Sequence, residues 1–350
     1  MRVLQVDAGR EWRGGQNQVR LLCRELLRAG VDVRLATKRD GPLALRAAAE
    51  GIPTAGVRWR LSLDPGTALD LLLEIVNFSP DVVHAHDSHS LRLVRWALAL
   101  AGWGGNTTPL VASRRVDFHI RRRSGWFRAD RVIAVSEAVR QILIADGLPA
   151  TDISVIPDGI DAEEVRANAA HALDIRARLG LPPDTPLAVN VAALVDHKDH
   201  RTLIRAAAHG RSLRPALHWA IAGEGELRHA LERDIAAQRL DDLVHLLGYV
   251  TEVDALIREA NVLVMSSKEE GLGSVMLHAL ALGTPVVATA AGGIPEVLPP
   301  ECLVPVGDAV ALATKVATVT TRPPSPVPLP LKFTAQSMSE ATLALYQALV

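Results

Sequence analysis

The sequence is poor in cysteine and has no excess of charge of either sign. Among its 350 residues there are two cysteines, Cys23 and Cys302, one near each end of the chain. Such sparse cysteines exclude a disulfide framework or a cysteine zinc knuckle, and they fit a reducing compartment. The 38 Lys and Arg residues balance 39 Asp and Glu residues, whereas nucleic-acid-binding proteins normally carry a strong basic excess. We therefore expect no nucleic-acid partner.

Patterns typical of secretion and membrane insertion are also missing. The first dozen residues already include four charged side chains rather than the apolar core and small-residue cleavage site of a secretion signal. The longest segment without Asp, Glu, Lys or Arg runs from Gly271 to Pro295, but Gly283, Pro285 and a glycine pair interrupt it, so it fits helix, turn and buried strand better than a membrane span. We expect a cytoplasmic protein, with at most peripheral contact with the inner surface of the cytoplasmic membrane.

Short runs rich in valine, isoleucine and leucine alternate with longer helical patterns. Strands that are apolar on both faces and alternate with helices are typical of a parallel sheet. The first series comprises residues 3–6, 31–36, 81–85, 110–112 and 131–135. After Pro186 the same rhythm restarts at residues 187–193, 217–222, 244–249, 261–265, 285–289 and 302–306. Because the chain is also longer than one hydrophobic core usually supports, we expect two α/β domains.

Turn-forming residues indicate where the domains divide. Turn formers flank the segment 153–186, so we place an N-terminal domain at residues 1–160 and a C-terminal domain at residues 161–334. The proline-rich segment 322–330 should run extended, and the helical spacing of residues 335–350 predicts a final helix that reaches back across the domain boundary. Up to residue 160 there are 22 basic and 17 acidic residues, and beyond it 16 and 22, so the near-neutral total conceals charges of +5 and −6.

A glycine pair, Gly14 and Gly15, follows the first strand and opens a helical pattern. Backbone amides at the start of a helix favour an anion. The spacing is not the G-x-G-x-x-G of dinucleotide-binding folds. The pair is therefore consistent with an anion site or with a simple turn.

Three histidines gather directly after the predicted strand 81–85, in the segment His84-Ala-His-Asp-Ser-His89. His84 and His86 share one face of a strand, so both could reach a metal ion. However, Asp87 stands one position earlier than in the H-x-H-x-D-H motif of metal-dependent hydrolases of the metallo-β-lactamase type. We favour a functional, metal-free His86, with a metal site and a structural role as alternatives.

Six arginines and three aromatic residues lie between Arg114 and Arg128. Arginine forks clamp phosphates, and arginine next to aromatic side chains suits an anionic membrane or a nucleotide base. The alternative is a solvated charged surface. We take Arg114, Arg115, Asp117 and Arg121 as candidate ligand-binding residues.

Lysine is rare, with arginine supplying most of the basic residues, so a lysine next to a predicted site is informative. Lys198 follows the strand 187–193 and precedes a helix. It therefore lies at the carboxyl edge of the second sheet, where open α/β folds bind ligands. We expect Lys198 to reach a phosphate, the alternative being an ordinary loop residue.

The segment 266–280 begins at a strand end, turns on glycines and continues as a helix. Glu270 is expected to point into the crevice beyond the strand. The amides of Gly273, Ser274 and Val275 start the helix and could hold a diphosphate. The segment 283–296 supplies a buried strand and a second glycine loop, so two amide-rich loops on neighbouring strands predict an anion cradle.

These segments resemble the donor site of the retaining glycosyltransferases of family 4. Further matches follow in order along nearly the whole chain: Gly14-Gly15, the strand 80–86, the segments 129–136, 156–161 and 222–225, and the final helix. The resemblance implies the GT-B fold, in which two Rossmann-like domains with parallel sheets face each other and a C-terminal helix returns to the N-terminal domain. It also implies an N-terminal acceptor domain and a C-terminal donor domain. With that division, the candidate acceptor-binding residues are Arg114, Arg115, Asp117 and Arg121.

The activity implied by the resemblance is transfer of a sugar from a nucleotide-diphosphate donor, with retained anomeric configuration. It implies no cofactor and no metal, because these enzymes lack the D-x-D motif of the other glycosyltransferase fold. By resemblance, Lys198 and the amides of Gly273, Ser274 and Val275 neutralise phosphate. Glu270 binds the hydroxyl groups of the donor sugar, Gly14 and Gly15 also belong to the donor site, and His86 approaches the sugar from the other domain.

Two departures from the family pattern bear on activity. Family members usually carry an arginine where this chain has Ala193, and a second acidic residue where it has His278. With Ala193, the site lacks one cation that would face the diphosphate. With His278, it lacks a carboxylate that would contact the ribose of the nucleotide. These departures motivate a catalytically impaired GT-B binding protein as an alternative.

The sequence therefore predicts a retaining, metal-independent glycosyltransferase that acts on an envelope glycan or a lipid-linked acceptor hydroxyl. A catalytically impaired binding protein is the first alternative. A nucleotide-sugar epimerase is the second, disfavoured because the matched segments belong to transferases.

Overall fold

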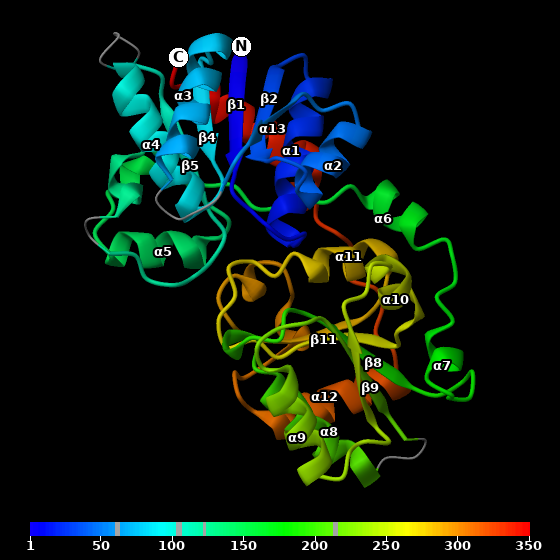
Figure 1. Ribbon diagram of the computed structural model, residues 1–350. Coiled ribbons are helices and arrows are strands. Elements are labelled where there is room, and N and C mark those ends of the chain that lie inside the picture. The colour runs from blue at the N-terminus through cyan, green and yellow to red at the C-terminus, as the bar shows by residue number, and fades with distance from the viewer. Residues whose placement is uncertain (60–63, 103–106, 122–123, 213–215) are drawn as a thin grey trace. The chain divides into compact units, whose positions relative to one another are not determined.

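The computed structural model describes residues 1–59, 64–102, 107–121, 124–212 and 216–350. The chain divides into an N-terminal unit, Met1–Ile160 with Leu331–Val350, and a C-terminal unit, Asp161–Pro330. Each unit is a parallel sheet with helices packed on it (Figure 1). The prediction of two parallel α/β domains is confirmed.

The N-terminal sheet has the strand order β3-β2-β1-β4-β5-β6-β7, and all of its neighbouring strands are parallel. Its strands are β1 (Arg2–Asp7), β2 (Asp32–Lys38), β3 (Thr54–Val57), β4 (Val82–Ala85), β5 (Leu110–Arg114), β6 (Arg131–Ala134) and β7 (Ile153–Val155). The helices of this unit are α1 (Gly14–Arg28), α2 (Pro42–Ala49), α3 (Pro65–Phe78), α4 (Ser88–Gly102), α5 (Glu137–Ala145) and α13 (Ala335–Gln347), with 3₁₀ turns at Gly125–Arg128, Ala150–Asp152 and Leu331–Phe333.

The C-terminal sheet has the strand order β10-β9-β8-β11-β12-β13, again all parallel. Its strands are β8 (Leu187–Val191), β9 (His218–Ala222), β10 (Val244–Gly248), β11 (Val262–Met265), β12 (Val286–Thr289) and β13 (Leu303–Val304). The helices of this unit are α6 (Ala162–Asn168), α7 (Ile175–Arg178), α8 (His200–His209), α9 (Arg228–Ala237), α10 (Val253–Glu259), α11 (Val275–Leu282) and α12 (Ala309–Thr321), with 3₁₀ turns at Asp196–Lys198, Gly210–Ser212, Ile294–Glu296 and Pro300–Cys302.

Two strands of the N-terminal sheet were not among those that the sequence predicts. β3 reads Thr-Ala-Gly-Val and lacks a run of bulky apolar residues. β7 has three residues and lies inside the segment that we took for an interdomain connection. Both are edge strands, and an edge strand needs less apolar sequence because only one side of it pairs.

The chain returns to the N-terminal unit at Leu331, a few residues before the predicted helix. Beside Ile160 the returning segment forms a parallel bridge at Thr334, with Ile160 N–H donating to the Phe333 carbonyl at 2.9 Å. A Cβ on Gly159 would lie 2.2 Å from the Thr334 carbonyl oxygen, so this close approach requires glycine. The two connecting segments therefore run side by side.

Helix α13, red in Figure 1, packs on α1 and completes the core of the N-terminal unit. Its Thr334 N-cap accepts a hydrogen bond from Ser337 N–H. Ala335, Met338 and Tyr346 join the buried cluster that includes α1 and the sheet. The last residues of the chain are therefore part of the first domain's core.

None of the helices in the described residues is long and apolar enough to cross a membrane.

Candidate functional site

The first group of candidate residues lies in the C-terminal unit, where the sheet order reverses between β8 and β11. Open α/β sheets bind ligands outside the carboxyl ends of the strands at such a reversal. Lys198 ends the 3₁₀ turn after β8, and Glu270 lies in the loop after β11. Their ammonium and carboxylate groups form an ion pair, and the side chains are 21% and 11% exposed. The fold thus joins two predicted site residues that are 72 positions apart.

Neighbouring loops hold Glu270 in position. Gly293 N–H donates to the Glu270 carbonyl at 3.0 Å, and the Ser267 hydroxyl donates to its carboxylate at 3.2 Å. Gly292 has a φ of +48°, and a Cβ there would lie 1.8 Å from the Glu270 carbonyl oxygen. The glycine loop after β12 therefore supports the backbone of Glu270 at a distance that only glycine permits.

Helix α11 begins directly beyond Glu270. Gly273 adopts a φ of +86°, and Ser274 occupies the N-cap position without a side-chain capping bond. The first N–H groups of a helix have no partner within the helix. The amides of Gly273, Ser274 and Val275 thus lie at the positive end of a helix dipole, in the same loop as the Lys198–Glu270 pair.

The structure gives both departures from the family pattern a context. Ala193 lies in the loop after β8, next to Gly223. His278, on α11, places Nδ1 2.7 Å from Oδ1 of Asp254, and Oδ2 of Asp254 accepts from the Asn168 amide at 3.0 Å. A carboxylate missing at position 278 is therefore present one helix away, at Asp254 on α10.

His200, two residues beyond Lys198, is a buried histidine at the start of α8. It is 1% exposed, and neither of its ring nitrogens has a hydrogen-bond partner among the described residues. Burial, together with the Lys198 charge, lowers the pKa of His200 to about 4. The ring is therefore neutral in the folded protein near neutral pH.

We predict that His200 makes the protein less stable in mild acid. The unfolded chain binds a proton at its ordinary pKa of about 6.5 and the folded chain only near 4, so the free energy of unfolding falls as pH drops below about 6.5. At pH 5 this loss is about 2 kcal/mol. Urea denaturation at pH 7.5 and pH 5 measures it. The difference between the two pH values should shrink in His200→Leu, and an unchanged difference would contradict the assignment.

The second group of candidate residues lies in the N-terminal unit, where the sheet order reverses between β1 and β4. His86 follows β4 and is 5% exposed. Its Nδ1 lies 3.2 Å from the Arg115 guanidinium, and its Nε2 lies 2.6 Å from Oε1 of Gln5. Because arginine only donates, Nδ1 accepts and Nε2 donates its proton to Gln5. Burial lowers the pKa of His86 well below its usual value, so the ring is neutral.

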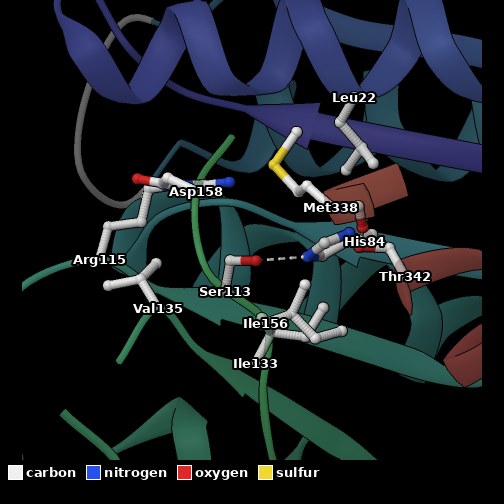
Figure 2. Close-up of a pocket in the computed structure, with 10 residues that line it drawn as sticks. All are labelled: Leu22, His84, Ser113, Arg115, Ile133, Val135, Ile156, Asp158, Met338 and Thr342. Atoms are coloured by element: carbon white, nitrogen blue, oxygen red, sulfur yellow. Dashed lines mark hydrogen bonds and ion pairs between the residues drawn. The ribbon is translucent and has the colours of Figure 1, made fainter. Parts of the chain in front are cut away.

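His84 lies deeper in the same network. One ring nitrogen lies 2.5 Å from the Tyr346 hydroxyl and the other 2.8 Å from the Ser113 hydroxyl, while the Gln5 amide donates to Tyr346 at 3.0 Å. Figure 2 shows His84 and Ser113 beside a cavity of about 10 Å³, which has room for about one water molecule. This space is too small for a substrate.

The histidine contacts argue against the metal alternative. All four ring nitrogens of His84 and His86 are hydrogen-bonded to protein groups. Asp87 instead accepts the N–H groups of Ala8 and His89, at 2.9 and 2.8 Å. Within the ranges that the structure describes, no three His, Cys, Asp or Glu side chains are grouped to hold a metal ion. His84 therefore has a structural role in the buried network. His86 lies at the carboxyl edge of the sheet and remains the candidate functional histidine.

We predict that the Tyr346 hydroxyl stabilises this network. Tyr346→Phe leaves the buried Gln5 amide and a His84 ring nitrogen without a partner, and we expect it to lower the free energy of unfolding by about 1–3 kcal/mol. The matched control is Tyr249→Phe, because Tyr249 is 59% exposed and should change stability little. Urea denaturation compares the two, and equal effects would contradict a specific role for Tyr346.

The four candidate acceptor residues do not form one exposed surface. Arg114 is 9% exposed, stacks 5.3 Å from the Trp126 ring and donates to the Phe118 carbonyl, so it is a buried packing residue. Arg115 pairs with Asp158 at 2.9 Å as well as with His86. In the same loop, Asp117 is half-buried and Arg121 is exposed. The neighbouring Arg122 and Arg123 of the predicted arginine cluster lie outside the described residues.

Gly14 and Gly15 form the first turn of α1 in the N-terminal unit. The turn has no side-chain capping bond and no acidic residue, so its amides are suited to an anion.

Sequence reasoning did not single out Asp7, which ends β1 beside His86 at the same edge of the sheet. Asp7 is 2% exposed and accepts hydrogen bonds from Gly9 N–H at 2.8 Å and the Gln16 amide at 3.3 Å. Burial, and then the charge of Asp87, raise the pKa of Asp7 to about 6. The sequence signal that could have identified Asp7 as a site residue is its position directly after the predicted strand 3–6.

Comparisons with known proteins agree with this geometry. Residues 12–164 match the family model described as Glycosyltransferase Family 4, and residues 172–334 match the model described as Glycosyl transferases group 1. The two matches divide the chain near the boundary between its units.

Individual relatives cover most of the chain. The putative glycosyltransferase EpsF of Bacillus subtilis is 27% identical over 82% of this chain and 78% of its own length. The putative colanic acid biosynthesis glycosyltransferase WcaL of Escherichia coli is 28% identical over 69% of this chain and 60% of its own length. Among solved structures, Anabaena HepE in complex with UDP and glucose has a TM-score of 0.82 at 19% identity, covering 99% of this chain and 100% of that one. That similarity shows the fold.

Proposed function

The chain belongs to the glycosyltransferases of family 4 with the GT-B fold, and from this premise we propose that it transfers a sugar from a nucleotide-diphosphate donor with retention of anomeric configuration. The acceptor that we propose is a hydroxyl group of an envelope glycan or a lipid-linked glycan. The observation that carries the proposal is the Lys198–Glu270 pair at the start of α11, beside free helix amides suited to a diphosphate.

In this mechanism the donor site works by electrostatic stabilisation. As the bond between the anomeric carbon and the phosphate oxygen breaks, negative charge develops on the diphosphate. Lys198 and the amides of Gly273, Ser274 and Val275 neutralise that charge without reorganising. Glu270 is then available to accept hydrogen bonds from the hydroxyl groups of the sugar. No metal ion or cofactor takes part in the proposed reaction.

The acceptor hydroxyl attacks the same face of the sugar. A bond forms between its oxygen and the anomeric carbon, and its proton passes to the departing phosphate oxygen, so no protein side chain needs to bond to the sugar. His86 contributes as a neutral ring. Since both of its nitrogens are engaged, contact with the sugar requires it to exchange the longer bond, the one from Arg115.

A panel of nucleotide sugars tests the donor assignment. We expect one of the UDP-, GDP-, ADP- or dTDP-sugars to raise the melting temperature and to release its nucleoside diphosphate faster when an acceptor is present. HepE was solved with UDP, and UDP-sugars are therefore tested first. Absence of any thermal shift with the whole panel would refute the donor site.

One observation favours a second candidate function, that of a GT-B-fold binding protein with impaired catalysis. Ala193 removes a cation from the loop after β8, and a charge-assisted hydrogen bond contributes roughly 1.5–3 kcal/mol. The same panel separates the candidates. The binding protein would show a thermal shift without release of nucleoside diphosphate, whereas an epimerase would convert the donor without any acceptor.

A further inference from the structure

The partners of His86 leave its ring a single form. The Arg115 guanidinium lies 3.2 Å from Nδ1, and Oε1 of Gln5 lies 2.6 Å from Nε2. A guanidinium only donates and an amide oxygen only accepts. With the proton on Nδ1 instead, two N–H groups would face each other at Arg115 and two acceptors at Gln5. A second proton on the ring would bring a positive charge against the guanidinium. The site therefore selects the neutral ring with its proton on Nε2.

This selection depends on Arg115, and Arg115 is in turn held by Asp158. The Arg115 Nε donates to Oδ1 of Asp158 at 2.9 Å, and the two side chains are 15% and 10% exposed. Both line the small cavity in Figure 2, together with His84 and Ser113. Burial raises the pKa of Asp158, and the Arg115 charge opposes that rise. Each of the two charges therefore compensates the burial of the other.

The backbone fixes Asp158 from both sides. Before it, Ile156 N–H donates to a backbone carbonyl of β6 at 3.0 Å. After it, Gly159 N–H donates to the Gln18 side chain of α1 at 3.1 Å, and a Cβ on Gly159 would clash with the returning segment. The carboxylate is therefore attached to rigid backbone, close to the point where the chain leaves the N-terminal unit.

We propose that Asp158 is a positioning residue for His86 and acts through Arg115. The carboxylate keeps the guanidinium against Nδ1, and the guanidinium selects the neutral ring with a lone pair on Nδ1. An ion pair that only stabilises the fold needs no contact with a histidine. The Asp158 pair differs because its arginine also donates to a candidate site residue.

The inference rests on the proposed function, in which His86 exchanges the Arg115 bond for contact with the donor sugar. A hydroxyl group of the sugar then donates to the Nδ1 lone pair. Asp158 keeps the displaced guanidinium paired, so the exchange leaves no buried charge without a partner. The remaining bond to Gln5 holds the orientation of the ring.

Nitrogen-15 NMR of the full-length protein, labelled at histidine, tests the proposal without donor or acceptor. Long-range proton–nitrogen spectra distinguish a protonated ring nitrogen from one that carries a lone pair, and the signals missing in His86→Gln are those of His86. At pH 7.5 we expect the wild type to show a protonated Nε2 and an unprotonated Nδ1. Asp158→Asn keeps the shape of the side chain but removes its charge. It should shift both His86 nitrogen signals toward the average of the two neutral forms.

A second variant, Arg115→Met, tests whether the carboxylate acts through the guanidinium. Arg115→Met removes the donor from Nδ1 directly, so it should shift the His86 signals at least as far as Asp158→Asn does. Adding Asp158→Asn to Arg115→Met should produce no further shift, because residues that act in series are not additive. Additive shifts from the two changes would overturn the proposal.

Asp70→Asn is the matched control in the same unit. Asp70, on α3, pairs with Arg58 at 2.6 Å, so the change also removes the charge of an aspartate that holds an arginine. Among the contacts of the described residues, this pair does not touch His86. The His86 signals should therefore stay as in the wild type. Circular dichroism confirms that each variant is folded.

Steady-state kinetics with the donor found in the nucleotide-sugar panel give a second readout. Asp158→Asn should lower the turnover number roughly tenfold, the effect of a misplaced site residue. The KM for the donor should change by less than about twofold, because Lys198 and the helix amides that hold the diphosphate are unchanged. A wild type that turns over no nucleotide sugar would refute the proposed function, while the NMR spectra would still decide whether Asp158 positions His86.

Three results would overturn the proposal. The first is a wild-type His86 that carries its proton on Nδ1. The second is a set of His86 signals in Asp158→Asn identical to those of the wild type. The third is unchanged turnover in an Asp158→Asn protein whose His86 signals have shifted, because the form of the ring would then not matter to the reaction.

Discussion

Replacing Lys198 with alanine is expected to lower the turnover number by roughly a hundredfold, the effect of removing one preorganised group that stabilises developing charge. Two consequences add up. The departing diphosphate loses its cation, which is not replaced from position 193 because that residue is alanine. The Glu270 carboxylate, only 11% exposed, also loses its cationic partner and faces the anionic donor with an uncompensated charge. Steady-state kinetics with saturating donor measure the effect.

The nearby Lys268 supplies the control. It is 45% exposed and lies 3.7 Å from the exposed Asp196 and 3.9 Å from the buried Asp199, so it has the same charge in an adjacent loop but pairs with aspartates instead of Glu270. Lys268→Ala should keep most of the turnover. Glu270→Gln tests the other half of the pair and should lower turnover at least tenfold. Normal rates in both Lys198→Ala and Glu270→Gln would remove the pair from the active site.

Replacing Gly292 with alanine is expected to disrupt both the donor site and the stability of the C-terminal unit. The new methyl group would lie 1.8 Å from the Glu270 carbonyl oxygen, and the residue would also have to keep a φ of +48°. Steric overpacking and a left-handed backbone together cost about 3 kcal/mol. Because the clash is with Glu270 itself, turnover should fall at least tenfold in the protein that remains folded. Denaturation and kinetics are measured on the same preparation.

The Gly307→Ala variant is a control that introduces the backbone strain of a positive φ without a steric clash. Gly307 has a φ of +77° in the same unit, and a Cβ there would meet nothing within 4 Å. This control should lose about 1 kcal/mol of stability and keep its turnover. If Gly292→Ala behaved like Gly307→Ala, the glycine loop would not support Glu270 and the proposed reason for its sequence would be wrong.

Most of the strands could be predicted because burial on both faces of a parallel sheet leaves a local mark on the sequence. The run at Leu187–Val191 and the run at Val262–Met265 are examples, each fully or nearly fully buried in the structure. β3 and β7 lack that mark because they lie at sheet edges. The connection of the final helix to the first domain followed from the proline-rich segment and the family resemblance.

The candidate site was predictable only in part. Lys198 and Glu270 stand in loops directly after predicted strands, so the topology of a parallel sheet places them at one edge. The exposure of the arginine segment was not predictable. Arg114 carries the same charge as Arg121, but Arg114 ends β5 and packs on Trp126 whereas Arg121 lies exposed in a loop.

Long-range hydrogen bonds left no local signal at all. Gln5 and Tyr346 are 341 positions apart, and nothing in either segment indicates that they meet beside His84. His278 and Asp254 are a second case. In the sequence, a histidine at position 278 indicates the loss of a carboxylate, but in the structure the Asp254 carboxylate of α10 lies beside it.

By itself the sequence determined the α/β class, the two units, the family and the strand ends that carry the donor-site residues, because hydrophobic period and turn chemistry act between near neighbours in the chain. Tertiary structure alone decided which charges pair, which histidine is buried in a network and which arginines are exposed. Those properties depend on contacts between residues that are distant in the chain and on the water that folding removes from around them. For this protein they separate a buried Arg114 from an exposed Arg121 in the same segment.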